Sequence, residues 1–99
     1  MTLEEIIQDL HAIDARLRAY ERKYGITSAD FYELYRQGLL DDEGFEQSTE
    51  YVRWASAYML KLKRAAAFEN ASHNFVAAIK ANAADHPLRL MPNPALAQI

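Results

Sequence analysis

The sequence contains no cysteine among its 99 residues, and only three glycines and three prolines. The absence of cysteine excludes disulfides, zinc thiolates and thiol catalysis, and it is typical of a reducing compartment. No run of about 18 apolar residues is present, so no transmembrane segment is expected. The first residues also lack the basic segment of a secretory signal peptide. These features predict a cytoplasmic protein with no membrane partner.

Neither sign of charge dominates the chain. Fourteen acidic and 11 basic side chains leave a net charge of −3. A weakly negative chain has no strong field for polyanions, which argues against nucleic acid as a partner. The short basic run Lys61-Leu62-Lys63-Arg64 is therefore expected to be a solvated helix face.

One long stretch, from Phe45 to about Ala84, contains neither proline nor glycine. Its apolar residues recur every three or four positions, which predicts one helix of roughly 40 residues and about 60 Å. This length exceeds what the core of one small globule needs, so part of the helix is expected to pack on another molecule. The stripe consists of Tyr51, Trp54, Ala55, Tyr58, Leu62, Ala65, Phe68, Ser72, Phe75, Val76, Ile79 and Ala83.

Two shorter helices are expected before this stretch. A helix over residues 2–24 begins at a capping box formed by Thr2 and Glu5, keeps a seven-residue apolar repeat and ends at Gly25. A second helix has its body between residues 30 and 37, after a capping residue. Its inward-facing residues are expected to be Phe31, Leu34 and Tyr35.

The charges on the two longer helices predict how they pack. Helix 2–24 is acidic in its first half and basic in its second, whereas helix 45–84 begins acidic and becomes basic in its middle. Antiparallel packing therefore places unlike charges together at both ends. The predicted fold is all-α, a helical hairpin with a short cross-helix over residues 28–37 and one long C-terminal helix. Residues 1–86 would form a single helical domain, followed by a proline-rich extended tail over residues 87–99.

Aromatic residues from all three helices are expected to meet at one point of this fold. Trp54 would be the centre of that core, because it lies on the long helix opposite the ends of the other two. A stacking platform for nucleic-acid bases would need a basic groove beside it, which the charge argues against. The predicted core anchor consists of Tyr20, Tyr24, Phe31, Trp54 and Tyr58.

No pattern in the sequence predicts a catalytic residue, a cofactor or a metal site. His11 with Asp14, and Glu69 with His73, could each share a helical face, but two ligands do not make a site. P-loop, nucleophile-elbow and glycine-rich phosphate motifs are absent. A helical-bundle enzyme or metal carrier is therefore less favoured than either kind of interaction protein, and we expect no enzyme.

Partner binding is expected at the C-terminal end of the chain. Helix 2–24 covers about residues 45–68, so residues 69–84 should overhang with an apolar stripe that is seldom left bare. We therefore predict a homodimer with a four-helix-like core. The tail after the long helix either frays in solvent or docks along a partner. The predicted partner-binding residues are Phe75, Val76, Ile79, Leu88, Arg89, Leu90 and Met91.

The middle of the chain, about residues 20–64, carries a resemblance to a known family. The residues concerned are Tyr20-Glu21-Arg22-Lys23-Tyr24-Gly25, Ser28, Phe31-Tyr32, Tyr35, Gly38-Leu39-Leu40-Asp41-Asp42, Glu50-Tyr51, Arg53-Trp54-Ala55 and Tyr58. This block resembles the small helical antitoxin-like proteins encoded beside TumE-type toxin partners. The resemblance implies a non-catalytic protein that binds and restrains a companion encoded nearby. The alternative is a structural self-association module of unknown role.

Overall fold

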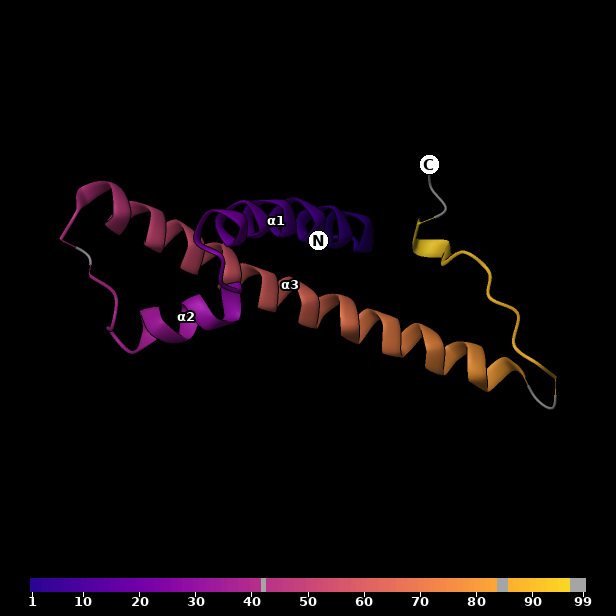
Figure 1. The fold of residues 1–99 in the computed structure, drawn as a ribbon. Coiled ribbons are helices and arrows are strands. Elements are labelled where there is room, and N and C mark those ends of the chain that lie inside the picture. The colour runs from indigo at the N-terminus through magenta and orange to yellow at the C-terminus, as the bar shows by residue number, and fades with distance from the viewer. Residues whose placement is uncertain (42, 84–85, 97–99) are drawn as a thin grey trace.

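The computed structural model describes residues 1–41, 43–83 and 86–96. Within them the chain forms three α-helices and no strand, which confirms the predicted all-α fold (Figure 1). The elements are α1 (Leu3–Tyr24), α2 (Ser28–Arg36), α3 (Phe45–Ala83) and a 3₁₀ turn, η1 (Pro94–Leu96). The expected helix end at Ala84 lies outside the described residues.

The ends of the two short helices follow from local chemistry. The Thr2 hydroxyl accepts a hydrogen bond from the Glu5 N–H at 3.1 Å, and the Glu5 carboxylate accepts one from the Thr2 N–H, as expected for a capping box. Gly25 ends α1 with a φ of 71°, a left-handed conformation that costs other residues strain. The Thr27 hydroxyl caps α2 by accepting from the Asp30 N–H.

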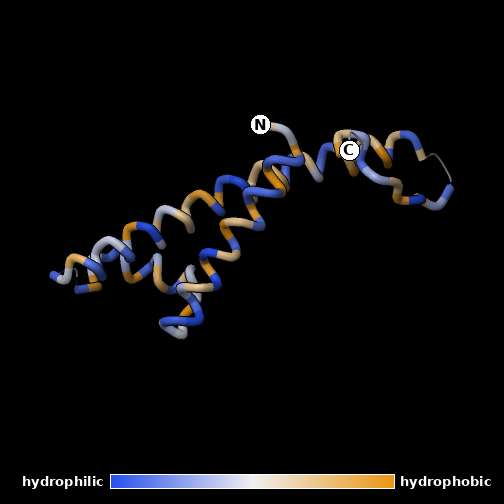
Figure 2. The backbone as a smooth tube through the Cα atoms, turned by 90° about the horizontal axis from the view of Figure 1, so that it is seen from above, coloured by the Kyte–Doolittle hydropathy of each residue, from blue (hydrophilic) through white to orange (hydrophobic). Residues whose placement is uncertain are grey.

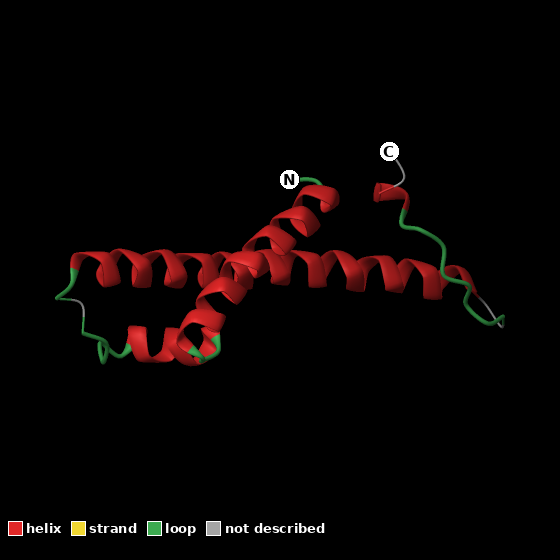
Figure 3. Ribbon diagram, turned by 45° about the horizontal axis from the view of Figure 1, so that its top comes forward, coloured by secondary structure: helices red, strands yellow, loops and turns green. Residues whose placement is uncertain are grey.

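α1 and α3 form the predicted antiparallel hairpin, with α1 crossing the first half of α3 and α2 packed beside it (Figures 1 and 3). Three ion pairs join α1 to α3, and their order along the chains shows the direction. They are Lys23–Glu50 at 2.9 Å, Asp14–Lys61 at 2.8 Å and Asp9–Arg64 at 3.3 Å. Because these pairs are partly solvated, each contributes only tenths of a kcal/mol and selects direction more than it stabilises.

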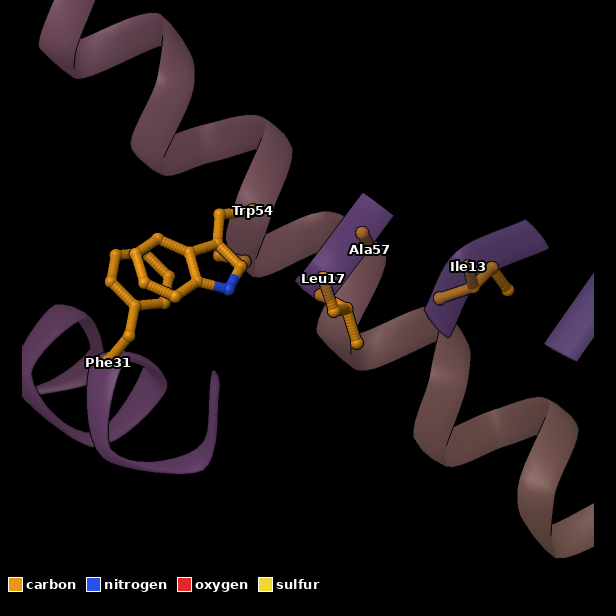
Figure 4. Close-up of a cluster of buried hydrophobic side chains, with 6 residues drawn as sticks. Ile13, Leu17, Phe31, Trp54 and Ala57 are labelled. Carbon is orange, nitrogen blue, oxygen red and sulfur yellow. The ribbon is translucent and has the colours of Figure 1, made fainter. Parts of the chain in front are cut away.

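The hydrophobic core is small and lies where the three helices meet. Only six apolar residues of the described chain are buried, namely Ile13, Leu17, Phe31, Trp54, Ala55 and Ala57 (Figure 4). The molecule itself extends 61 Å in its long direction. Most of α3 therefore lies outside the core, and apolar and polar residues alternate along its whole length (Figure 2).

Two details of the expected packing are wrong. Leu34 and Tyr35 of α2 are each 37% exposed, and Tyr32 packs against the core in their place. α2 docks on α3 through Phe31 and Tyr32, which leaves Leu34 and Tyr35 at the edge of the contact. The Tyr35 ring still stacks on Phe31, with ring centroids 5.8 Å apart. Leu62, expected in the packed stripe of α3, is also half exposed because Ala57 and Lys61 are the residues turned toward α1.

The C-terminal tail folds back on the helices. After α3 the chain reverses direction, and η1 comes to lie against α1 near the N-terminal end of that helix (Figure 1). Asn93 stabilises the η1 turn. Its side-chain oxygen accepts a hydrogen bond from the Ala95 N–H, and its backbone carbonyl accepts one from the Leu96 N–H, both at 2.9 Å. The tail is extended from Pro87 to Asn93, and residues 97–99 lie outside the described part. Over the residues described, no helix has the length and apolar character needed to cross a bilayer.

Candidate protein-binding surfaces

The aromatic cluster lies at the junction of the three helices. Trp54 is only 1% exposed and stacks on Phe31 with ring centroids 3.8 Å apart and planes 4° from parallel. Tyr20 and Tyr24 of α1 stack on the same indole at 5.3 and 5.5 Å. Tyr58 lies on the α2 side, 5.4 Å from Tyr32. These rings hold one end of α3 to both other helices and so position the surfaces around it.

A buried polar chain runs through this cluster. The Trp54 Nε1–H donates to the Ser28 hydroxyl at 2.9 Å. The Ser28 hydroxyl in turn donates to the Glu21 carboxylate at 2.7 Å, and the Ser28 N–H donates to the same oxygen at 2.9 Å. The chain joins α3 to α2 and α2 to α1, and it satisfies the indole N–H, which a buried tryptophan needs. Sequence reasoning missed it, because a serine at the start of a helix is already explained by capping.

The predicted partner-binding residues lie on two segments of different exposure. In α3, Phe75 and Ile79 are half-buried and Val76 is exposed. In the tail, Leu88, Arg89, Leu90 and Met91 are all exposed, and Leu90 keeps 81% of its surface. The last turns of α3 run past the N-terminal end of α1, as Figure 1 shows. A hollow of about 260 Å³, which Leu10 shares with Phe68 and Ser72, marks where α1 stops covering α3.

A second apolar surface, which sequence reasoning missed, lies between α1 and the first half of α3. This groove has a volume of about 590 Å³ and is lined by Arg16, Tyr20, Val52, Arg53, Ser56, Ala57 and Leu60. A hollow of about 360 Å³ continues it toward the start of α3 and shares Tyr20 and Arg53 with it. Phe45 stands at the far end of that hollow and is 85% exposed. Apolar contacts are therefore available along about four turns of α3.

A sequence signal for this second surface does exist. Phe45, Val52 and Met59 recur every seven residues, and all three are exposed. They lie on a different side of α3 from Trp54 and its stripe, so α3 is apolar on more than one side. A helix that is apolar on several sides is typically covered on several sides. The apolar stripe predicted from the sequence, which contains Trp54, follows only one of the apolar sides of α3.

The charges around the groove are of both signs. Arg16 and Arg53 line it and form no ion pair within the described residues, whereas Glu46 and Glu50 line the adjoining hollow. Glu50 is already paired with Lys23, and a hydrogen bond from the ammonium group to this carboxylate raises the pKa of Lys23. Arg16 thus lines the groove and Glu46, an acid with no ion-pair partner among the described residues, lines the adjoining hollow, with Arg53 shared between the two.

The candidate metal ligands His11, Asp14, Glu69 and His73 all lie within the described residues. No group of three metal-ligating side chains comes together in them. Asp14 is engaged by Lys61 rather than by His11, and the Glu69–His73 pair is 3.9 Å apart and largely exposed on both sides. No protein-family model, curated protein or solved structure matches the chain.

Proposed function

We propose that this chain is a non-catalytic protein–protein interaction module of the antitoxin-like kind, which binds and restrains a partner encoded nearby. The observation that carries the proposal is the imbalance between core and surface. Six apolar residues are buried in the described chain, while fifteen large apolar side chains are exposed. Where such side chains lie together on a surface, they typically mark an interaction site.

The proposed contact surface is the end of α3 together with the tail. Val76 projects from α3, and Leu88, Leu90 and Met91 add exposed apolar side chains to the returning segment. Pro87 and Pro92 restrict the backbone on either side of these residues, which lowers the entropy lost when the segment is ordered on a partner. Arg89 is exposed between them and would add a charge-assisted hydrogen bond to an acidic group.

The shape of the chain supports a role in restraining a partner. The helical junction around Trp54 is packed, and α3 carries its own C-terminal end away from that junction as a single continuous helix, while the tail returns toward α1. A partner bound there would meet a long apolar edge and not a closed pocket. Covering an extended strip of the partner would occlude its working surface without any chemistry by this chain.

The test is co-expression with the protein encoded by the neighbouring gene, followed by co-purification and calorimetric titration. We expect a complex with the full-length chain, and at least tenfold weaker binding by the variant L90S/M91S. Leu39→Ser is the matched control, because Leu39 is equally apolar and 65% exposed but lies in the connection between α2 and α3, far from the tail. No complex with the full-length chain, or equal binding by the tail variant and the control, would overturn the proposal.

A further inference from the structure

One face of α3 carries both an exposed aromatic side chain and a groove that could accept such a side chain. Phe45 is the most exposed large apolar side chain of the described residues. The groove lined by Val52, Ser56 and Leu60 begins about two turns farther along the same helix. Ser56 and Ala57 are small, which leaves room for an aromatic ring between α1 and α3. The two features are too far apart in one molecule to meet.

We propose that a second copy of this chain covers the face, with the two α3 helices antiparallel about a two-fold axis near Val52 and Arg53. Residues at equal distances from the axis then face each other, so that Phe45 comes opposite Leu60 and Thr49 opposite Ser56. Phe45 of each copy enters the groove of the other. A two-fold interface uses the same patch on both subunits, so the contact between Phe45 and the groove occurs twice in the dimer.

The charges select this orientation. Glu46 follows Phe45 in the chain, and in the antiparallel arrangement it reaches the Leu60 end of the partner groove, where Arg16 lies. Neither Arg16 nor Glu46 forms an ion pair within the described residues of one chain, so both are free to pair across the interface. Parallel helices would instead place Phe45 against Phe45 and Glu46 against Glu46, and both grooves would stay empty.

The same observations favour a second copy over a different protein. An aromatic side chain would fill the space above Ser56 and Ala57, and an acid next to it would pair with Arg16. This chain already presents Phe45, Glu46 and Val52 in that order on the face that carries the groove. The homodimer expected from the overhang is thus assigned to the first half of α3, and it does not rest on the proposed function of the tail.

The first test is the molar mass of the full-length protein by sedimentation equilibrium. We expect twice the 11.3 kDa of the chain at micromolar concentration. Phe45→Ser should raise the dissociation constant at least thirtyfold with unchanged helical content, whereas the control Leu39→Ser leaves it unaltered. Arg16→Glu and Glu46→Arg should each weaken the dimer, and their combination should restore it. A monomeric wild-type protein, or a dimer that Phe45→Ser leaves intact, overturns the proposal.

A second test reads the register directly and uses the absence of cysteine from the chain. The double variant T49C/S56C should form an interchain disulfide on mild oxidation, because these positions face each other across the axis. Within one chain they are about 10 Å apart along α3, too far to bridge. Each single variant should stay unlinked. Cross-linking of the single variant Thr49→Cys, which needs like positions to meet, would refute the antiparallel register.

Discussion

Replacement of Ser28 by alanine should destabilise the fold far more than the loss of one hydroxyl normally does. The hydroxyl is buried and joins the Trp54 N–H to the Glu21 carboxylate. Ser28→Ala leaves the indole N–H without an acceptor in a site that is 1% exposed, at a cost of about 1–3 kcal/mol. It also removes a charge-assisted bond to Glu21, although the Ser28 N–H still reaches that carboxylate. We expect a loss of about 2–4 kcal/mol, a large share of the roughly 5–15 kcal/mol typical of a small domain.

A double-mutant cycle separates the polar chain from simple packing. Trp54→Phe removes the donor, so in that background Ser28→Ala no longer leaves a buried N–H without an acceptor. An unmet buried hydrogen bond costs about 1–3 kcal/mol, so Ser28→Ala should destabilise the Trp54→Phe variant by at least about 1 kcal/mol less than it destabilises the wild-type protein. Residues in direct contact couple by about 0.5–3 kcal/mol, whereas independent sites add within roughly 0.3–0.5 kcal/mol. The control is Ser72→Ala, an exposed serine of α3 that is expected to change stability by less than about 0.5 kcal/mol.

The assay is urea unfolding followed by circular dichroism at 222 nm, because the Trp54→Phe variant has no tryptophan to follow by fluorescence. All variants are compared at one protein concentration, since self-association would make the apparent stability concentration-dependent. Additive effects of Ser28→Ala and Trp54→Phe would show that the hydrogen bond from the indole contributes nothing, and would refute the reasoning.

Two further predictions concern charged groups. Asp14→Lys should lower the free energy of unfolding by about 0.5 kcal/mol, as expected for a partly exposed ion pair, and adding Lys61→Asp should recover most of this loss. The same urea transitions measure both effects, and a further loss of stability in the double variant would contradict the pairing. Hydrogen bonds from Arg36 and then Gln37 lower the pKa of Glu33, and carboxyl NMR titration should show this pKa rising in Arg36→Ala. Because the pKa is lowered in the folded state, the associated stability is present above the unfolded pKa and is lost as the pH falls through the folded value.

The parts of the fold that sequence reasoning anticipated are those set by local or paired signals. Thr2 and Gly25 mark helix ends through hydrogen bonds and backbone conformation within a few residues of themselves. The antiparallel hairpin follows from charge order, and Asp14 and Lys61 do meet. The aromatic residues around Trp54 recur at helical spacing, so their meeting point could be placed on α3.

The parts it missed depend on how elements dock. The exposure of Leu34 is set by which side of α2 meets α3, and a nine-residue helix with apolar residues on two sides leaves that choice open. The groove beside Val52 was missed for the same reason, because periodicity alone does not show which side of α3 meets α1. The return of η1 to α1 joins opposite ends of the chain, and no local signal in Pro94 or its neighbours foretells it.

The unbroken length of α3 fixes a distance between the two surfaces described above. Val52 and Ile79 are separated by about 40 Å at 1.5 Å per residue, several times the roughly 8 Å over which salt screens charge. Groups bound against Val52 and groups bound against Ile79 are therefore too far apart for direct contact or appreciable electrostatic interaction with each other. In an antiparallel pair the two C-terminal ends of α3 would point in opposite directions. The two tail-side surfaces of such a dimer would therefore lie at opposite ends of the assembly, far from the interface between the copies.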